Sequence, residues 1–201
     1  GGYTGSAKTA VLAELAKAGE QVVDLEGLAR HFGSAFGNLE RHPQPTSEHF
    51  RNLLADALDG LDASRRIWVE NESRRIGKVH LPEPFYQRMI ACPALEMLRT
   101  TDDRVDHLVE MYGAFDLGLL RQGFEAIRAE LGGVETEEAL KALDAEDLAK
   151  GARIALAYYD RTYEHGLQKR AGDRRYPVDC GGVSLADCAV YLIAEADRLG
   201  L

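Results

Sequence analysis

The chain begins Gly1-Gly2-Tyr3-Thr4-Gly5-Ser6-Ala7-Lys8-Thr9, and this stretch decides the predicted fold. Aligned on Lys8, it matches the phosphate-loop pattern G-x-x-x-x-G-K-[ST], except that Ala7 replaces the second glycine. The methyl group of Ala7 costs little if the backbone there has a negative φ. It costs roughly 1–2 kcal/mol if φ is positive. The alternative is a glycine-rich turn that precedes a helix and binds no ligand.

A helix is predicted directly after this stretch. Val11, Leu12 and Leu15 recur at helical spacing, and Gly19 is placed to end the helix. The first turn of a helix presents unpaired N–H groups and the positive end of the helix dipole, which together attract phosphate. We therefore expect the opening residues to hold a phosphate chain at the start of this helix.

Short apolar segments alternate with helical ones along much of the sequence. The predicted strands are residues 21–26, 66–70, 94–98 and 175–179, and further helices are predicted to begin near residues 47, 83 and 185. This alternation is typical of an α/β fold in which helices flank a parallel sheet, as in P-loop NTPases. A strand normally precedes a phosphate loop, so we expect the chain to be a fragment that lacks its N-terminal strand.

The middle of the sequence has a different pattern. Apolar residues from position 105 onward, including Leu117, Leu120, Phe124, Ile127 and Leu131, keep helical spacing without intervening strands. We predict a helical insertion or lid subdomain of three or four helices over residues 102–170. The P-loop α/β domain is predicted to comprise residues 1–101 and 171–201.

Composition limits the function. The 24 Lys and Arg residues against 33 Asp and Glu give a formal charge of −9, which excludes a generally basic protein that coats nucleic acid. Local recognition of a polyanion stays possible. No apolar run approaches the roughly 20 residues that cross a bilayer, so no membrane partner is expected. The three cysteines form no CxxC motif, and we expect reduced thiols and a cytoplasmic location.

Acidic and basic side chains follow the predicted strand at residues 66–70. Glu70 stands where P-loop proteins place the acid that holds Mg²⁺, although Glu72 and Asp24 compete for this role. Arg74 and Arg75 come next, where guanidinium groups could bind phosphate. A second set of basic residues gives weaker phosphate-binding candidates, for which solvated surface charge is the favoured interpretation: Arg104, Lys169, Arg170, Arg174 and Arg175.

Three segments resemble the C-terminal P-loop domain of the tRNA 2-selenouridine synthase family. The first is the opening loop together with Asp24-Leu25-Glu26-Gly27-Leu28-Ala29-Arg30-His31-Phe32-Gly33-Ser34-Ala35-Phe36-Gly37. The second is Trp68-Val69-Glu70-Asn71-Glu72-Ser73-Arg74-Arg75-Ile76-Gly77 with Val79-His80-Leu81-Pro82. The third runs from Tyr158-Tyr159-Asp160 to Lys169-Arg170. Together they span nearly the whole chain.

The resemblance implies an enzyme that acts on the wobble uridine of tRNA. The family replaces the sulfur of 2-thiouridine with selenium from selenophosphate, through an S-geranylated intermediate made from geranyl diphosphate. Its full-length members carry an N-terminal rhodanese-like domain with a reactive cysteine, which would act in cis and is missing here. The implied ligands are Mg²⁺, tRNA and a small phosphate-bearing donor: a nucleotide (ATP or GTP), geranyl diphosphate or selenophosphate.

The resemblance and the phosphate-loop pattern together give a set of candidate site residues. The phosphate-binding candidates are Gly2, Gly5, Ser6, Ala7, Lys8, Thr9 and Arg74. The Mg²⁺ candidates are Thr9 and Glu70, and the catalytic candidates are Glu26 and Glu72. The residues implied to bind substrate or tRNA are Arg30, His31, Ser34, Phe36 and Arg75, of which the Arg30–Phe36 loop would close over the substrate.

Two other functions stay open. A small-molecule kinase of the nucleoside type would share the phosphate loop, and Asp24 or Glu26 could act as the base for an acceptor hydroxyl. A non-catalytic module that binds tRNA in a nucleotide-dependent way is the other. The kinase predicts ADP formation that depends on a small acceptor, whereas the module predicts salt-sensitive tRNA binding without a product.

Overall fold

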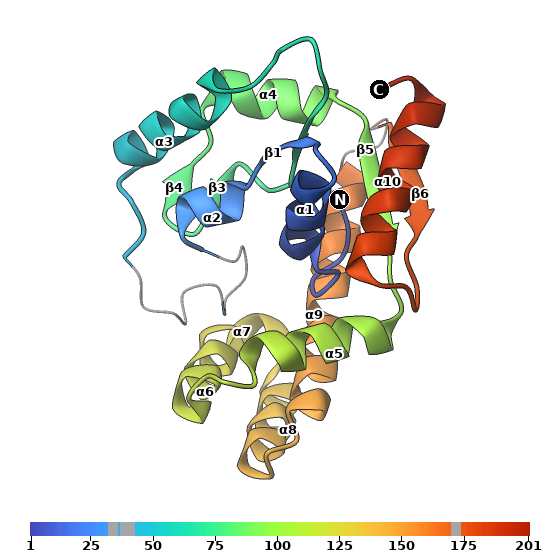
Figure 1. The fold of residues 1–201 in the computed structure, drawn as a ribbon. Coiled ribbons are helices and arrows are strands. Elements are labelled where there is room, and N and C mark those ends of the chain that lie inside the picture. Colours follow the sequence, from blue (N-terminus) through green and yellow to red (C-terminus); the bar gives the residue numbers. More distant parts are fainter. Residues whose placement is uncertain (32–35, 37–42, 170–173) are drawn as a thin grey trace. The chain divides into compact units, whose positions relative to one another are not determined.

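A computed structural model describes residues 1–31, 36, 43–169 and 174–201 (Figure 1). The chain divides into two compact units. The α/β unit contains Gly1–Gly2, Ala7–Leu98 and Asp173–Leu201, and the helical unit contains Tyr3–Ser6 and Arg99–Gly172. This division differs from the predicted one at the start of the chain, because four residues of the opening loop group with the helices.

The α/β unit alternates helices with short strands, as the sequence pattern indicates. Its helices are α1 (Lys8–Lys17), α2 (Leu25–Ala29), α3 (Ser47–Asp59), α4 (Glu83–Ala91) and α10 (Leu185–Leu199). Its strands are β1 (Gln21–Val23), β2 (Ile67–Val69), β3 (Arg75–Ile76), β4 (Val79–His80), β5 (Ala94–Leu98) and β6 (Arg175–Asp179). Side-chain oxygens cap several of these helices, since Thr46 accepts from the His49 N–H and Ser184 accepts from the Asp187 N–H, each at 3.1 Å.

The strands of the α/β unit pair mainly in parallel. β1 pairs with β2, and β5 pairs with β6. Gly2 forms a parallel bridge to Met97 of β5. A Cβ built on Gly1 would lie 3.5 Å from Asn71 Nδ2, just after β2, and 3.2 Å from Glu96 Oε1 on β5. The Gly1–Gly2 segment therefore runs between the two parallel pairs and leads directly into the opening loop.

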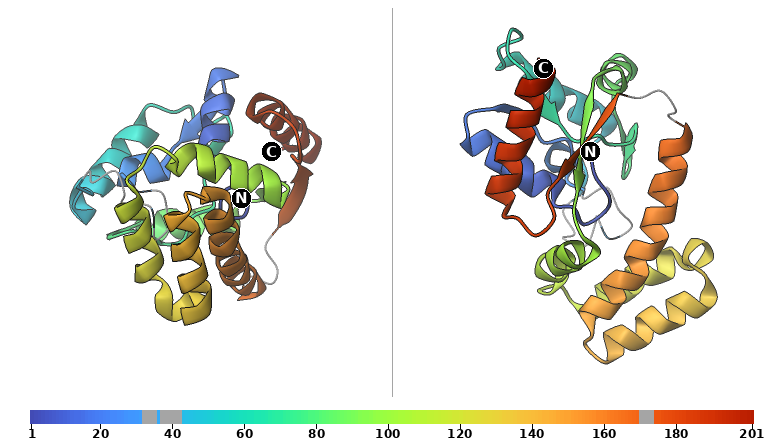
Figure 2. Two further views of the ribbon diagram at one scale, coloured as in Figure 1. Left: turned by 90° about the horizontal axis from the view of Figure 1, so that it is seen from below. Right: turned by 90° about the vertical axis from the view of Figure 1, so that its right-hand side faces the viewer.

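Two apolar clusters hold the α/β unit together. One joins α1 and α10 to β5 and β6, and α10 lies along these strands in Figures 1 and 2. Its buried members are Val11, Leu12, Leu15, Leu95, Met97, Val178, Cys180, Cys188, Ala189, Leu192 and Ala196. The other joins α2 and α3 to the antiparallel β3–β4 hairpin, with Phe50 and Leu25 fully buried at its centre. Burial of these side chains fixes the elements that carry the site.

The helical unit contains the predicted apolar stripe. Its helices are α5 (Thr101–Tyr112), α6 (Leu117–Ala126), α7 (Arg128–Leu131), α8 (Gly133–Asp144) and α9 (Leu148–Lys169). Figure 2 shows α8 alongside α9, and α5 also packs on α9. The stripe from Leu117 to Leu131 is divided between α6 and α7, because Ile127 has a non-helical φ of −108°.

One local prediction is wrong, and one short hairpin has no signal in the sequence. The segment predicted as a strand over residues 21–26 leaves the strand after Val23, because Asp24 accepts a hydrogen bond from the Gly27 N–H (2.7 Å) and caps α2. Glu26 therefore lies in the first turn of a short helix instead of at a strand end. The β3–β4 hairpin was not predicted, since its two-residue strands are too short to show a periodic pattern.

Candidate phosphate and cation site

The opening loop contains a left-handed residue at the start of α1. Ala7 has φ 63° and ψ 34°, and its carbonyl accepts the Val11 N–H at 2.9 Å. This is the conformation for which the phosphate-loop pattern calls for glycine. The methyl group of Ala7 therefore stores strain of roughly 1–2 kcal/mol, the more costly of the two possibilities that the sequence left open.

Two polar side chains of this loop bear on the predicted binding of phosphate. The Ser6 hydroxyl is buried and has no hydrogen-bond partner within the part of the chain that the structure describes. A buried hydroxyl without a partner is costly, and a ligand oxygen would satisfy it. Lys8 Nζ donates to the Gly2 carbonyl oxygen at 3.2 Å, so the ammonium group is held beside the loop backbone. A phosphate would offer this ammonium a stronger, charged acceptor.

Thr9 contacts one buried and one half-buried carboxylate from different elements. Its hydroxyl donates to Glu26 Oε2 of α2 at 2.8 Å and lies 3.5 Å from Glu70 Oε1, which follows β2. The other oxygen of Glu70 accepts the Leu25 N–H at 2.9 Å. This backbone bond orients Glu70 toward Thr9. Three of the residues predicted for metal and catalysis thus lie together at the carboxyl ends of β1 and β2.

Burial and neighbouring acids disfavour the ionised forms of these two carboxylates, although the charge of Lys8 opposes the effect at Glu26. Burial is the largest cause that raises the pKa of Glu26, to about 7, and the negative charge of Glu72 adds to the effect. Burial also raises the pKa of Glu70, as does the charge of Asp24 beside it. A cation bound here would stabilise both ionised carboxylates.

The donor set suits Mg²⁺. Within the described residues, no group of three or more His, Cys, Asp or Glu side chains is arranged to hold a metal ion. Magnesium in phosphate-binding proteins commonly keeps several waters and takes only one or two protein carboxylates, and ligand phosphates complete its shell. The Thr9 hydroxyl and Glu70 match this requirement, and neither Glu72 nor Asp24 contacts Thr9 through a hydrogen bond of this kind.

The predicted arginines, Arg74 and Arg75, make their described contacts within the α/β unit. Arg74 forms an ion pair with Glu83 of α4 at 2.9 Å, and its side chain is 54 % exposed. Arg75 is exposed on β3 and donates from Nε to the Gly77 carbonyl. Both belong to the hairpin region.

The residues after α2 are described only in part. Arg30 caps α2 in the left-handed conformation, with φ 50°, and is exposed. His31 is half-buried, and burial lowers its pKa while Glu72 opposes the change. Phe36 is buried, and Ser34 lies outside the described residues.

Arg104 is a residue that the sequence interpretation misjudged. It was interpreted as solvated charge, yet its side chain is only 6 % exposed. It makes a two-pronged ion pair with Asp160 and also binds the opening loop. The Tyr158-Tyr159-Asp160 segment was part of the family resemblance, but nothing in the sequence pairs Asp160 with an arginine 56 positions away.

Comparisons with known proteins identify the family of the chain. A family model described as "tRNA 2-selenouridine synthase AAA domain" matches residues 1–142. The chain belongs to this family. Among curated relatives, the tRNA 2-selenouridine synthase of Shewanella sp. (strain MR-7) is 33 % identical over 204 residues, covering 86 % of this chain and 54 % of the relative. The enzyme of the same name from Salmonella schwarzengrund (strain CVM19633) is 34 % identical over 205 residues, covering 86 % and 55 %.

This synthase-family chain spans about half the length of the curated relatives that it matches. No solved structure matches it significantly. Across residues 1–31, 36, 43–169 and 174–201, none of the helices has the length and apolar character needed to cross a membrane.

Proposed function

We propose that this chain is the phosphate-binding domain of a tRNA-modifying transferase that converts wobble 2-thiouridine to 2-selenouridine. The opening loop binds the diphosphate of a small donor with Mg²⁺, and geranyl diphosphate is the donor that we favour. The helical unit serves as the lid subdomain. The named relatives support the tRNA-modifying role, and the loop geometry supports the binding of a phosphate-bearing ligand.

One observation carries the proposal: the Thr9 hydroxyl lies between the buried Glu70 carboxylate and the half-buried Glu26 carboxylate. The loop just before it carries the Lys8 ammonium and a Ser6 hydroxyl that has no hydrogen-bond partner among the described residues. A glycine-rich turn that only begins a helix has no need of these groups. Burial of Glu70 and partial burial of Glu26 cost free energy, and the charge of Lys8 offsets this cost only in part at Glu26. A bound cation would recover more of it. The arrangement is thus typical of a binding site rather than of a structural turn.

Diphosphate chemistry fits these groups. When geranyl is transferred, a carbon–sulfur bond to the thiouridine forms, the carbon–oxygen bond to diphosphate breaks, and the thiouridine base loses its N3 proton. Negative charge then collects on the departing diphosphate. Lys8 and the N–H groups at the start of α1 stabilise that charge, and Mg²⁺, when bound at Thr9 and Glu70, supplies further electrostatic stabilisation.

Glu26 has a pKa suited to proton transfer. A carboxyl with a pKa of about 7 accepts or releases a proton near neutral pH. We assign Glu26 to this role, with Glu72 beside it as the charge that helps to raise its pKa. We assign Arg30, His31 and Arg75 to contacts with tRNA or substrate, but not Phe36, whose side chain is buried.

The test is a calorimetric comparison of candidate donors. Geranyl diphosphate, selenophosphate, ATP and GTP are titrated into the chain with and without Mg²⁺. We expect geranyl diphosphate to bind most tightly, and Mg²⁺ to strengthen binding. The Thr9→Val variant keeps the side-chain shape but removes the hydroxyl, and it should lose most of the Mg²⁺-dependent gain.

Thr162→Val is the matched control, because Thr162 lies on α9 and its hydroxyl donates only to the Tyr158 carbonyl of the same helix. It should bind like the wild type. If Mg²⁺ strengthens binding equally in the wild type and in folded Thr9→Val, the cation does not bind at Thr9. If none of the four donors binds, the proposed function is wrong.

The raised pKa of Glu26 also favours a second candidate, a small-molecule kinase in which Glu26 accepts the proton of an acceptor hydroxyl. Incubation with ATP and a set of nucleosides separates the two. Acceptor-dependent ADP formation supports the kinase, whereas binding of thiolated tRNA and geranyl diphosphate without ADP supports the transferase. Salt-sensitive tRNA binding with no turnover of any donor would instead indicate a non-catalytic module.

A further inference from the structure

Residues 3–6 of the opening loop are anchored to the helical unit by a buried arginine. Arg104 Nε donates to the Thr4 carbonyl oxygen at 2.8 Å. Its two terminal nitrogens donate to the two carboxylate oxygens of Asp160, at 3.0 and 2.5 Å. All three guanidinium nitrogens are therefore engaged, so that Asp160 sets the orientation in which Arg104 meets the loop.

Tyr3 makes a second set of contacts in the same place. Its ring lies 5.2 Å from the Arg104 guanidinium carbon and 4.7 Å from the centre of the Tyr163 ring. Its hydroxyl lies 3.4 Å from Glu164 Oε1. The side chain before Thr4 is thus packed between α5 and α9, which restricts the loop backbone that follows it.

Gly5 is in tight contact with the backbone of α5. It has a φ of +79°, and a Cβ built there would lie 3.0 Å from the Arg104 carbonyl oxygen and 3.2 Å from Leu108 Cγ. A side chain at this position would push the loop away from α5. Gly5 therefore allows the close approach that brings the Thr4 carbonyl within reach of Arg104.

The contact fixes the direction of one peptide group. The Thr4 carbonyl and the Gly5 N–H belong to the same planar trans peptide, so they point in opposite directions. When Arg104 holds the carbonyl, the Gly5 N–H is held on the side of the loop away from Arg104. In an anion-binding loop, donors must converge on the ligand and carbonyl oxygens must point away from it.

We propose that Arg104, held by Asp160, is a positioning residue that turns the Gly5 N–H toward the bound diphosphate. The proposal rests on the proposed function, because it assumes that the loop binds such a ligand. Arg104 itself donates to the loop and to Asp160, and does not touch the ligand. The Arg104–Asp160 pair thereby affects ligand affinity through a single peptide group of the loop.

The test uses inorganic pyrophosphate with Mg²⁺ as the probe and four variants of the whole chain. Arg104→Met removes the guanidinium, whereas Arg104→Lys keeps a cation for Asp160 but cannot hold the carboxylate with two prongs and the Thr4 carbonyl at once. Arg153→Met is the matched control, because Arg153 of α9 pairs with Asp102 of α5 at 2.6 Å without contacting the loop. Lys8→Ala tests whether the opening loop binds pyrophosphate at all.

We expect Arg104→Met and Arg104→Lys each to weaken pyrophosphate binding about tenfold, while Arg153→Met changes it less than about twofold. In ¹⁵N NMR spectra, pyrophosphate should shift the Gly5 amide signal in the wild type and in Arg153→Met. This shift should be much smaller in Arg104→Lys, even where its melting temperature matches that of Arg153→Met. A merely structural ion pair would not alter the Gly5 signal in a variant of unchanged stability.

The inference is overturned if folded Arg104→Lys binds pyrophosphate as tightly as Arg153→Met and shows the wild-type Gly5 shift, while Lys8→Ala has lost binding. If Lys8→Ala binds like the wild type, the proposed function fails instead. If Arg104→Met does not fold, Arg104→Lys decides the question alone.

Discussion

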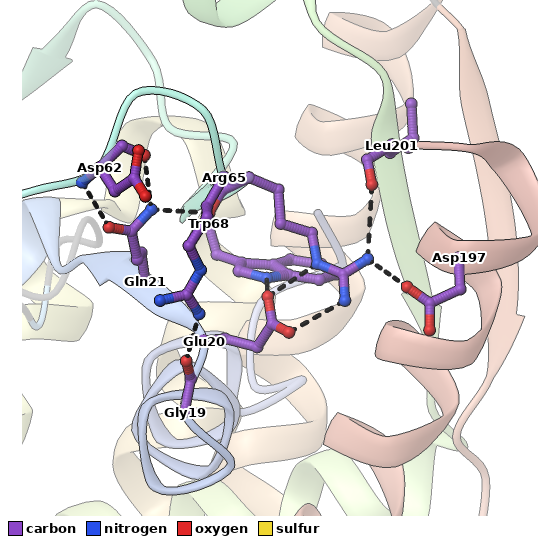
Figure 3. Close-up of polar contacts among 9 residues, drawn as sticks. Gly19, Glu20, Gln21, Asp62, Arg65, Trp68, Asp197 and Leu201 are labelled. Atoms are coloured by element: carbon purple, nitrogen blue, oxygen red, sulfur yellow. Dashed lines mark hydrogen bonds and ion pairs between the residues drawn. The ribbon is translucent and has the colours of Figure 1, made fainter.

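The hydrogen bonds of Glu20 are predicted to stabilise the α/β unit. Glu20 lies between α1 and β1, and its carboxylate accepts two hydrogen bonds from Arg66, at 2.7 and 2.9 Å, and one from Trp68 Nε1 at 2.7 Å (Figure 3). Arg66 also reaches Asp197 of α10 at 2.6 Å. Glu20 is 14 % exposed and Arg66 is 21 % exposed, so water screens the pair only in part.

The hydrogen bonds from Arg66 lower the pKa of Glu20 from 4.5 to about 2. A shift of this size corresponds to about 3 kcal/mol of stabilisation. Because the folded-state pKa is below the unfolded one, the stabilisation is complete above about pH 5 and is lost as the pH falls toward 2. Glu20→Gln keeps an acceptor for Trp68 but loses the charge, so we expect it to lower the free energy of unfolding by about 2 kcal/mol at pH 7.

The assay is urea denaturation from pH 7 down to pH 3.5, followed by far-UV circular dichroism because the single tryptophan lies within the network. The stability gap between the wild type and Glu20→Gln should narrow by about 1 kcal/mol over this range. Glu14→Gln is the control, since Glu14 lies on the preceding helix α1 and pairs with Lys17, which is 70 % exposed. It should change stability by less than about 0.5 kcal/mol. If the difference in stability between the wild type and Glu20→Gln stays constant with pH, the ionised form of Glu20 is not what stabilises the fold.

Three further predictions concern strain, surface charge and the core. Ala7→Gly relieves roughly 1–2 kcal/mol of strain, but it removes a buried methyl group and increases the entropy of the unfolded chain. The free energy of unfolding, measured by urea denaturation, should therefore change by less than about 1 kcal/mol. A loss of stability above about 2 kcal/mol would show that the left-handed conformation of Ala7 is not strained. Arg74→Ala should weaken tRNA binding in a filter assay and reduce its salt slope by about 1, more than Arg128→Ala; equal effects would make Arg74 ordinary surface charge. Phe50→Ala removes a fully buried ring and should lower the free energy of unfolding, measured by urea denaturation, by about 3–5 kcal/mol. A loss below about 1 kcal/mol would place Phe50 outside the core.

Local signals in the sequence predicted much of the fold. Helical spacing and capping residues such as Thr46 and Ser184 gave α1, α3 and α10, and short apolar runs gave β2, β5 and β6. These predictions succeeded because each depends on neighbouring residues alone. The strand over residues 21–26 failed where two local preferences compete, since Asp24 can follow a strand or cap a helix and the hydrogen bond to Gly27 decides the outcome.

The site could be predicted only where its residues are close in sequence or belong to a known pattern. Lys8 and Thr9 follow from the phosphate-loop pattern, and Glu70 from its place after an apolar strand. The role of Arg104 could not be predicted, because it depends on contacts with Thr4, 100 positions earlier, and Asp160, 56 positions later. Nothing short of the folded chain brings these three residues together.

The central claim is that the loop at residues 2–9 binds the phosphates of a ligand. The most direct measurement is a calorimetric titration of pyrophosphate with Mg²⁺ into the wild type, Lys8→Ala and Lys17→Ala, where Lys17 is the exposed lysine at the other end of α1. The account predicts that Lys8→Ala binds at least about tenfold more weakly, equivalent to about 1.4 kcal/mol, and that Lys17→Ala binds like the wild type. Equal affinities in all three folded proteins would contradict it.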